Sequence, residues 1–155
     1  MGARRMKYPG QRGCSLSELL VAIAVIATMS LASLPFLLTY LPSVTLTWAA
    51  RDMQSALNRA KLLAVTTRQS ICVQVIPGGY QFLTVNCAGT SWKGSGTDSG
   101  GTFRLPNNIT ASNAGSSPIF TKFGTASQTG TITVTGPGGQ SRTVTVSAMG
   151  RIVIP

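Results

Sequence analysis

The chain has 155 residues and is 43% hydrophobic, which suits one small domain with an additional apolar element. Thirteen Lys and Arg residues against three Asp and Glu give a formal net charge of +10, so acidic proteins, anionic lipids or nucleic acids are plausible partners by charge. Histidine, the usual proton-transfer group near neutral pH, is absent, and metal-binding side chains are few. We therefore expect that the protein is not an enzyme and that it binds neither a cofactor nor a metal ion.

The N-terminal region combines a basic leader with a long apolar stretch. Residues 1–13 are polar and basic, and no formal charge occurs from Leu19 to Trp48. About 20 helical residues cross a hydrocarbon core of roughly 30 Å, so this stretch is long enough to span a bilayer once. The positive-inside rule keeps the leader in the cytoplasm and places the rest of the chain outside the inner membrane.

The order of the processing signal is unusual. A secretory signal is cut after its apolar region, whereas Gly13-Cys14 precedes it here. Cleavage at this point would remove residues 1–13 and leave the apolar helix on the mature chain. A lipoprotein is the other interpretation of Gly-Cys, but that class requires an apolar stretch before the cysteine, and residues 1–13 have none.

The segment GCSLSELL, from Gly13 to Leu20, resembles the cleavage motif of type IV prepilins and pseudopilins. The resemblance implies that a prepilin peptidase cuts after Gly13 and N-methylates Cys14, where the family usually has Phe. Glu18 is then the fifth mature residue, which in this family pairs with the N-terminal amine of a neighbouring subunit and sets the stagger of assembly. Pro35 is the twenty-second, where pilin helices commonly carry a proline.

Two features of this helix have alternative interpretations. A carboxylate at a membrane-helix centre costs roughly 2.5–3.5 kcal/mol, so Glu18 either pairs with a cation or reaches water at the interface. Proline removes a backbone donor, so the helix either kinks near Pro35 and Pro42 or ends at Pro42.

A second, amphipathic helix is predicted near residues 48–69, with Thr45 or Thr47 as its cap. Its apolar positions recur at helical spacing: Met53, Leu57, Ala60 and Ala64. This stripe is expected to pack on the following sheet rather than on another subunit.

From residue 71 onward the pattern alternates and β-branched residues dominate. Strands are predicted at 71–76, 80–85, 102–105, 118–123, 130–135, 141–147 and 151–154. Pro77-Gly78-Gly79 and residues 136–139 are predicted hairpin turns, so the strands should run antiparallel. Residues 86–101 are rich in Gly and Ser and are predicted to form an exposed loop.

The body of the chain also resembles a known group. Residues 49–75 and 120–154 are similar to the helix-to-strand segment and the C-terminal hairpin of H-type minor pseudopilins of type II secretion and of FimT-like minor pilins. The resemblance implies an α+β fold: a long N-terminal helix, half in the membrane and half amphipathic, packed on an antiparallel β domain. The divisions are a cleaved leader (1–13), a transmembrane assembly helix (14–41), a linker and amphipathic helix (42–69) and an extracytoplasmic β domain (70–155).

This resemblance implies a structural function. The chain is expected to be a minor subunit of a type II secretion pseudopilus or a type IV pilus. Its expected partners are other pilin-like subunits, the prepilin peptidase and an inner-membrane assembly platform. The expected location is the bacterial inner membrane, with the C-terminal domain in the periplasm or at a filament tip.

Cys72 and Cys87 are a candidate disulfide in a domain expected to face an oxidising compartment. Pairing Ile76 with Tyr80 in the first hairpin would place Cys72 opposite Thr84. Cys87 would then reach Cys72 only if the chain curls back, and the strand register decides whether it does.

DNA binding is the alternative function. FimT-like DNA receptors carry a Gly-Arg-x-Arg motif near the C-terminus, and Gly150-Arg151-Ile152-Val153 keeps its first arginine and lacks the second. A basic face for phosphates or for a protein partner would consist of Arg142, Arg151 and Lys122, with Arg104 and Lys93. The other interpretation is an ordinary solvated face, and a structural role is favoured over DNA uptake.

Overall fold

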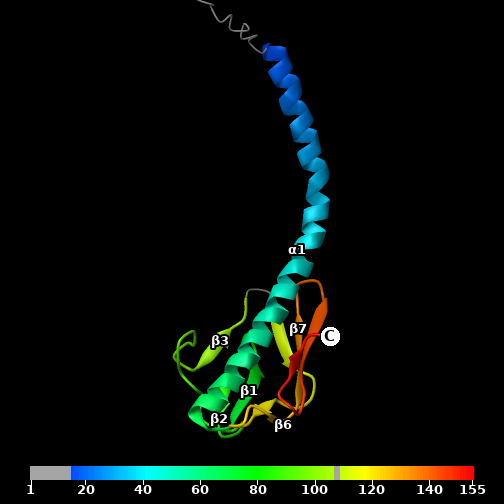
Figure 1. Cartoon of the computed structure of the whole chain (residues 1–155). Coiled ribbons are helices and arrows are strands. Elements are labelled where there is room, and N and C mark those ends of the chain that lie inside the picture. Colours follow the sequence, from blue (N-terminus) through cyan, green and yellow to red (C-terminus); the bar gives the residue numbers. More distant parts are fainter. Residues whose placement is uncertain (1–14, 107–108) are drawn as a thin grey trace, which may run out of the picture. The chain divides into compact units, whose positions relative to one another are not determined.

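The computed structural model describes residues 15–106 and 109–155, with the backbone alone for residues 31–40. The chain divides into two compact units after Leu38. Helix α1 (Leu16–Thr67) supplies the first unit and continues into the second, where nine strands follow it (Figure 1). The predicted α+β class, a long N-terminal helix before an antiparallel β domain, is confirmed.

Helix α1 has no break at the predicted linker. It includes Pro42, so the alternative in which the helix ends there is wrong, as is a separate second helix. The hydroxyls of Thr45 and Thr47 donate to the carbonyls of Pro42 and Ser43 within the helix and do not cap a new one. Burial begins at Leu46. Packing therefore stabilises the helical turns after Pro42, and this stabilisation exceeds the cost of the hydrogen bond that the proline removes.

The strands form two antiparallel sheets. The first has the order β3-β2-β1-β5-β6 and the second the order β4-β7-β8-β9. The bounds are β1 Ile71–Ile76, β2 Gly79–Thr84, β3 Thr102–Arg104, β4 Thr110–Asn113, β5 Ile119–Phe120, β6 Ala126–Gln128, β7 Gly130–Thr135, β8 Ser141–Val146 and β9 Ile152–Val153. The predicted hairpin turn after β7 is confirmed, because Thr135 pairs with Ser141.

The main corrections to the strand predictions concern β4, β6 and β5. Strands β4 and β6 were not predicted, because TASN and ASQ lack an alternating apolar pattern, and each pairs with only one strand. The strand predicted at 118–123 is shorter. It ends at Phe120 because a turn follows, in which Gly124 adopts a φ of +78° and its amide donates to the carbonyl of Thr121.

The register of the first hairpin also differs from the prediction by one residue. Ile76 pairs with Gly79, and Cys72 pairs with Leu83 rather than Thr84. The turn therefore has two residues, Pro77 and Gly78. Proline presets the negative φ of the first central position and Gly78 has a φ of +80°, as a type II turn requires.

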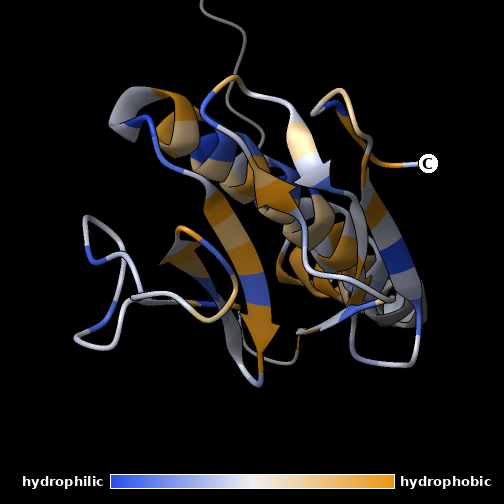
Figure 2. Ribbon diagram, turned by 90° about the horizontal axis from the view of Figure 1, so that it is seen from below, coloured by the Kyte–Doolittle hydropathy of each residue, from blue (hydrophilic) through white to orange (hydrophobic). Residues whose placement is uncertain are grey.

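The C-terminal half of α1 packs on both sheets through the predicted stripe. Met53, Leu57, Ala60 and Ala64 have no exposed surface, which confirms that the stripe faces the core. The buried face of the helix is rich in alanine, and larger strand residues such as Phe82 and Phe120 fill the space between the helix and the sheets. In Figure 2 the hydrophobic stretches of the helix and the strands gather in this interior. Each large side chain buried there contributes roughly 1.5–3 kcal/mol.

The C-terminal strand is tied to α1 by two polar side chains. Gln54 donates to the carbonyl of Ile152 over 3.2 Å, and the Lys61 ammonium donates to the carbonyl of Gly150 over 3.0 Å. Gly150 has a φ of +71°, and a β-carbon there would collide with the carbonyl oxygen of Gly124. The glycine therefore permits both the turn and its close approach to its neighbour.

Replacing Gly150 with Ala should lower the free energy of unfolding by about 3 kcal/mol, since a left-handed φ and backbone overlap each cost roughly 1–2 kcal/mol. Gly139 is the matched control: its φ is +78° and a β-carbon there would meet nothing within 4 Å. We expect Gly139→Ala to cost about 1 kcal/mol. Urea unfolding of both variants measures the difference, and equal losses would contradict the close approach at Gly150.

Candidate functional site

The described start of α1 exposes a continuous apolar surface. Eight large side chains there have between 46% and 81% of their surface exposed: Leu16, Leu19, Leu20, Val21, Ile23, Val25, Ile26 and Met29. We expect molecules outside the chain to pack against these eight side chains, because monomeric soluble domains seldom expose contiguous apolar areas beyond a few hundred Å².

Glu18 is the acidic residue of this surface and lies in the first turn of α1. The amides of Glu18 and Leu19 donate to the carbonyl of Ser15, so the helix starts directly after that serine. A carboxylate in the first turn interacts favourably with the positive end of the helix dipole. The predicted cleavage residues Gly13 and Cys14 lie outside the described residues. Pro35 lies in the helix, and its side chain is outside the described set.

Among the helical residues that the structure describes with their side chains, no segment is both long and apolar enough to qualify as a membrane span. The predicted transmembrane helix, 14–41, includes residue 14 and residues 31–40, which lie outside that set.

The three basic residues proposed for DNA or a partner do not form one face. Arg142 lies near the start of β8, where it lines a hollow of about 300 Å³ with Trp48 and Arg51. Arg151 follows the turn at the other end of β8, and five residues of strand span roughly 17 Å. Lys122 lies in the turn after β5, which contacts Gly150. The structure therefore groups Lys122 with Arg151 and separates Arg142.

The other two basic residues of the predicted face lie elsewhere. Arg104 belongs to β3, in the other sheet, and its guanidinium is 4.0 Å from the Asp98 carboxylate. Lys93 belongs to the loop at residues 86–101. Within the described residues, the five cations therefore form no continuous phosphate-binding surface.

The loop at residues 86–101 is held on α1 by Arg59, which sequence reasoning did not single out. Its guanidinium lies 5.5 Å from the Trp92 ring centre and 5.1 Å from that of Phe103, and it donates to the carbonyl of Ser95 over 2.6 Å. The rings of Trp92 and Phe103 stack nearly parallel. The sequence contained one indication of this contact: Trp92 is the single aromatic residue in a loop of mostly small and polar residues.

Two ionisable groups of the domain have structural roles. Asp98 accepts hydrogen bonds from the amides of Thr102 and Gly100, which lower the pKa of its carboxyl and close a turn. Burial raises the pKa of the Tyr80 hydroxyl to about 12, and the Asp52 carboxylate acts in the same direction. No group of three metal-ligating side chains occurs in the described part of the chain.

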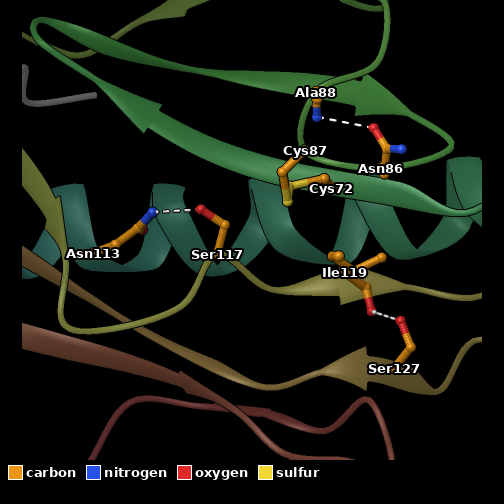
Figure 3. The surroundings of a disulfide bond; sticks show 8 residues. All are labelled: Cys72, Asn86, Cys87, Ala88, Asn113, Ser117, Ile119 and Ser127. Atoms are coloured by element: carbon orange, nitrogen blue, oxygen red, sulfur yellow. Dashed lines mark hydrogen bonds between the residues drawn. A yellow bond between two sulfur atoms is a disulfide. The ribbon is translucent and has the colours of Figure 1, made fainter.

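Cys72 and Cys87 form a disulfide, as predicted, with Cα atoms 5.2 Å apart (Figure 3). The chain curls back directly after β2. Val85 has a φ of +72°, unusual for a β-branched residue, and its amide donates to the carbonyl of Ser70. Cys72 is fully buried, so the bond joins the start of the loop to the interior of the domain.

Residues 49–150 match the family model described as type II transport protein GspH. The chain belongs to this family. It is a minor pilin-like structural subunit that assembles with other pilin-like subunits. The match starts at the buried half of α1 and ends at the turn that Lys61 holds.

Solved structures with the same fold agree with this family. The minor pseudopilin EpsH from the type 2 secretion system of Vibrio cholerae is 13% identical, with a TM-score of 0.55, and the match covers 71% of this chain and 95% of EpsH. The type IV minor pilin FimU of Pseudomonas aeruginosa is 22% identical, with a TM-score of 0.50 and coverage of 71% and 87%. At these identities the likeness concerns the fold. A search of curated proteins gave no match.

Replacing both Cys72 and Cys87 with Ala should lower the free energy of unfolding by about 3 kcal/mol, the chain-entropy value for a loop of roughly 15 residues. Urea unfolding without reductant measures the loss. Dithiothreitol should destabilise the unsubstituted protein and leave the double variant unchanged. Equal stability of the two proteins without reductant would contradict a structural role of the bond.

Proposed function

We propose that this subunit is made as a prepilin, is anchored in the bacterial inner membrane by the N-terminal part of α1, and enters a filament through that helix. The apolar surface from Leu16 to Met29 carries the proposal, because its large side chains are between 46% and 81% exposed. In the membrane, lipid covers these side chains. In the filament, the corresponding helices of neighbouring subunits replace the lipid.

Glu18 directs this lateral packing. Its carboxylate lies among exposed leucines, Leu16, Leu19 and Leu20, so a bilayer or a helix bundle removes it from water. A charge in such surroundings is stabilised when an opposite charge is near. The free amine created by cleavage after Gly13 is such a charge. It belongs to the neighbouring subunit, so the pair forms only on assembly and fixes the axial offset between helices.

The start of α1 supports cleavage after Gly13. α1 begins at Leu16, directly after the site, so the new N-terminus precedes the helix by two residues. In this proposal the amine of Cys14 is the group that is N-methylated and that meets a neighbouring carboxylate.

The β domain serves as the recognition part of the subunit. It lies in the periplasm or at the filament tip, where an oxidising compartment keeps Cys72 and Cys87 joined. Its partners are other pilin-like subunits of a type II secretion pseudopilus or a type IV pilus, together with the inner-membrane platform that assembles them.

Substituting Glu18 with Gln should abolish the charge pair and reduce incorporation into filaments at least tenfold, while leaving membrane anchoring intact. Asp52→Asn is the matched control, because Asp52 is the other acidic residue of α1 and lies outside the apolar surface. The measurement is the amount of the subunit in sheared filaments relative to the membrane fraction. Incorporation of Glu18→Gln at the level of Asp52→Asn would contradict the assembly role.

A further inference from the structure

Two neighbouring turns expose large apolar side chains beside the end of α1. The turn at 121–125 carries Phe123, which is 78% exposed, and the turn at 147–150 carries Met149, which is 81% exposed. These are the most exposed large apolar side chains of the described part of residues 39–155. Val65 of α1, 42% exposed, lies against the first of these turns at Gly124.

Backbone contacts hold the two turns in fixed positions. The amide of Ala126 donates to the carbonyl of Ala148 over 3.0 Å, and Gly150 lies directly against the carbonyl of Gly124. A β-carbon on Gly124 would lie 3.5 Å from a methyl group of Val65, so the first turn also contacts the helix. Phe123 and Met149 therefore project from a preformed surface, which reduces the conformational entropy that a partner must overcome.

The rim of this surface is positively charged. The Lys122 ammonium lies 5.2 Å from the centre of the Phe123 ring, and Arg151 is the residue after Gly150. The Lys61 ammonium binds the carbonyl of Gly150. The acidic side chains of the described residues lie elsewhere: Glu18 starts α1, Asp98 faces Arg104, and Asp52 acts on Tyr80. We call this surface the Phe123–Met149 patch: Val65, Phe123 and Met149, with Lys61, Lys122 and Arg151.

We propose that the Phe123–Met149 patch is a docking surface for an acidic protein segment that carries at least one exposed apolar side chain. Apolar side chains on two turns of fixed backbone, with cations on and beside those turns, match a partner whose apolar contact is flanked by carboxylates. Two copies of this chain do not fit patch to patch, because the cationic rims of the two patches would face each other.

The placement of the patch favours a protein over other anionic partners. Lys61 and Val65 lie 20 to 24 residues beyond Leu41 in the chain, outside the proposed membrane segment 14–41; this step rests on the proposed function. A phosphate-binding surface places its cations foremost. Here large apolar side chains, Phe123 and Met149, are 78% and 81% exposed on the turns that carry or adjoin the cations.

Binding of the full chain in detergent micelles tests the proposal. The probes are the other pilin-like subunits of the same organism, each purified in the same detergent, with a DNA duplex and phosphatidylglycerol vesicles as comparison probes. We expect one acidic subunit to bind. Phe123→Ser with Met149→Ser should weaken that binding at least tenfold, since roughly 1.4 kcal/mol of lost apolar burial corresponds to a factor of ten. Lys122→Gln with Arg151→Gln should remove most of its salt dependence.

Matched controls separate the patch from general surface effects. Leu62 is 63% exposed on the same helix but lines a hollow with Arg59 and Trp92, so Leu62→Ser should bind normally. Arg104→Gln is the charge control, and an unchanged melting temperature verifies that each variant folds.

Three outcomes would overturn the proposal. In the first, no subunit binds, and in the second, the double variant with Phe123→Ser and Met149→Ser binds as tightly as the unsubstituted chain. In the third, the patch variants lose only their binding to DNA or to vesicles. Binding in micelles needs neither leader cleavage nor the Glu18 pair. If the Glu18→Gln test of filament incorporation fails, it therefore contradicts the proposed function alone and does not affect the binding result.

Discussion

The packing of α1 against two sheets is the constraint on which the rest of the structure depends. Between Leu46 and Ala64 the buried face of the helix is made largely of alanines, and residues of both sheets pack with it in one core. The first sheet adds the aromatic cluster of Tyr80, Phe82 and Phe103, and the second adds Ile132, Val134 and Val144. Without the helix, each sheet would expose its apolar face to water.

Helix α1 has two roles because its surface differs along its length: one part packs in the core of the domain and the other exposes apolar side chains. Its buried half needs partners from within the chain, and its start, from Leu16 to Met29, needs partners from outside. This division accounts for a subunit that works by packing and has few side chains suited to acid–base chemistry. The chain has no histidine and three acids, one of which, Glu18, lies where assembly would use it. Cations instead fix local geometry: Lys61 holds the C-terminal turn and Arg59 holds the loop at 86–101.

Much of the fold was predictable because the patterns that specify it are local. The stripe from Met53 to Ala64, most strands and the second hairpin turn follow from periodicity and turn residues. The one-residue register error at Ile76 arose because Pro77-Gly78-Gly79 contains two glycines, and the sequence does not indicate which one belongs to the strand. Continuity of α1 through Pro42 was decided by tertiary burial after Leu46, which local propensity does not contain. The site was predictable in part: Cys72 and Cys87 were found, whereas the grouping of Lys122 with Arg151, apart from Arg142, depends on two turns meeting at Gly124 and Gly150.

The most direct test of the central claim is the intact mass of the protein extracted from membranes, with and without its prepilin peptidase. The account predicts that the peptidase removes residues 1–13 and adds one methyl group at Cys14, and that the leader remains when the peptidase is absent. A leader that persists in the presence of the peptidase, or a diacylglycerol adduct on Cys14, would contradict assembly through the N-terminal helix.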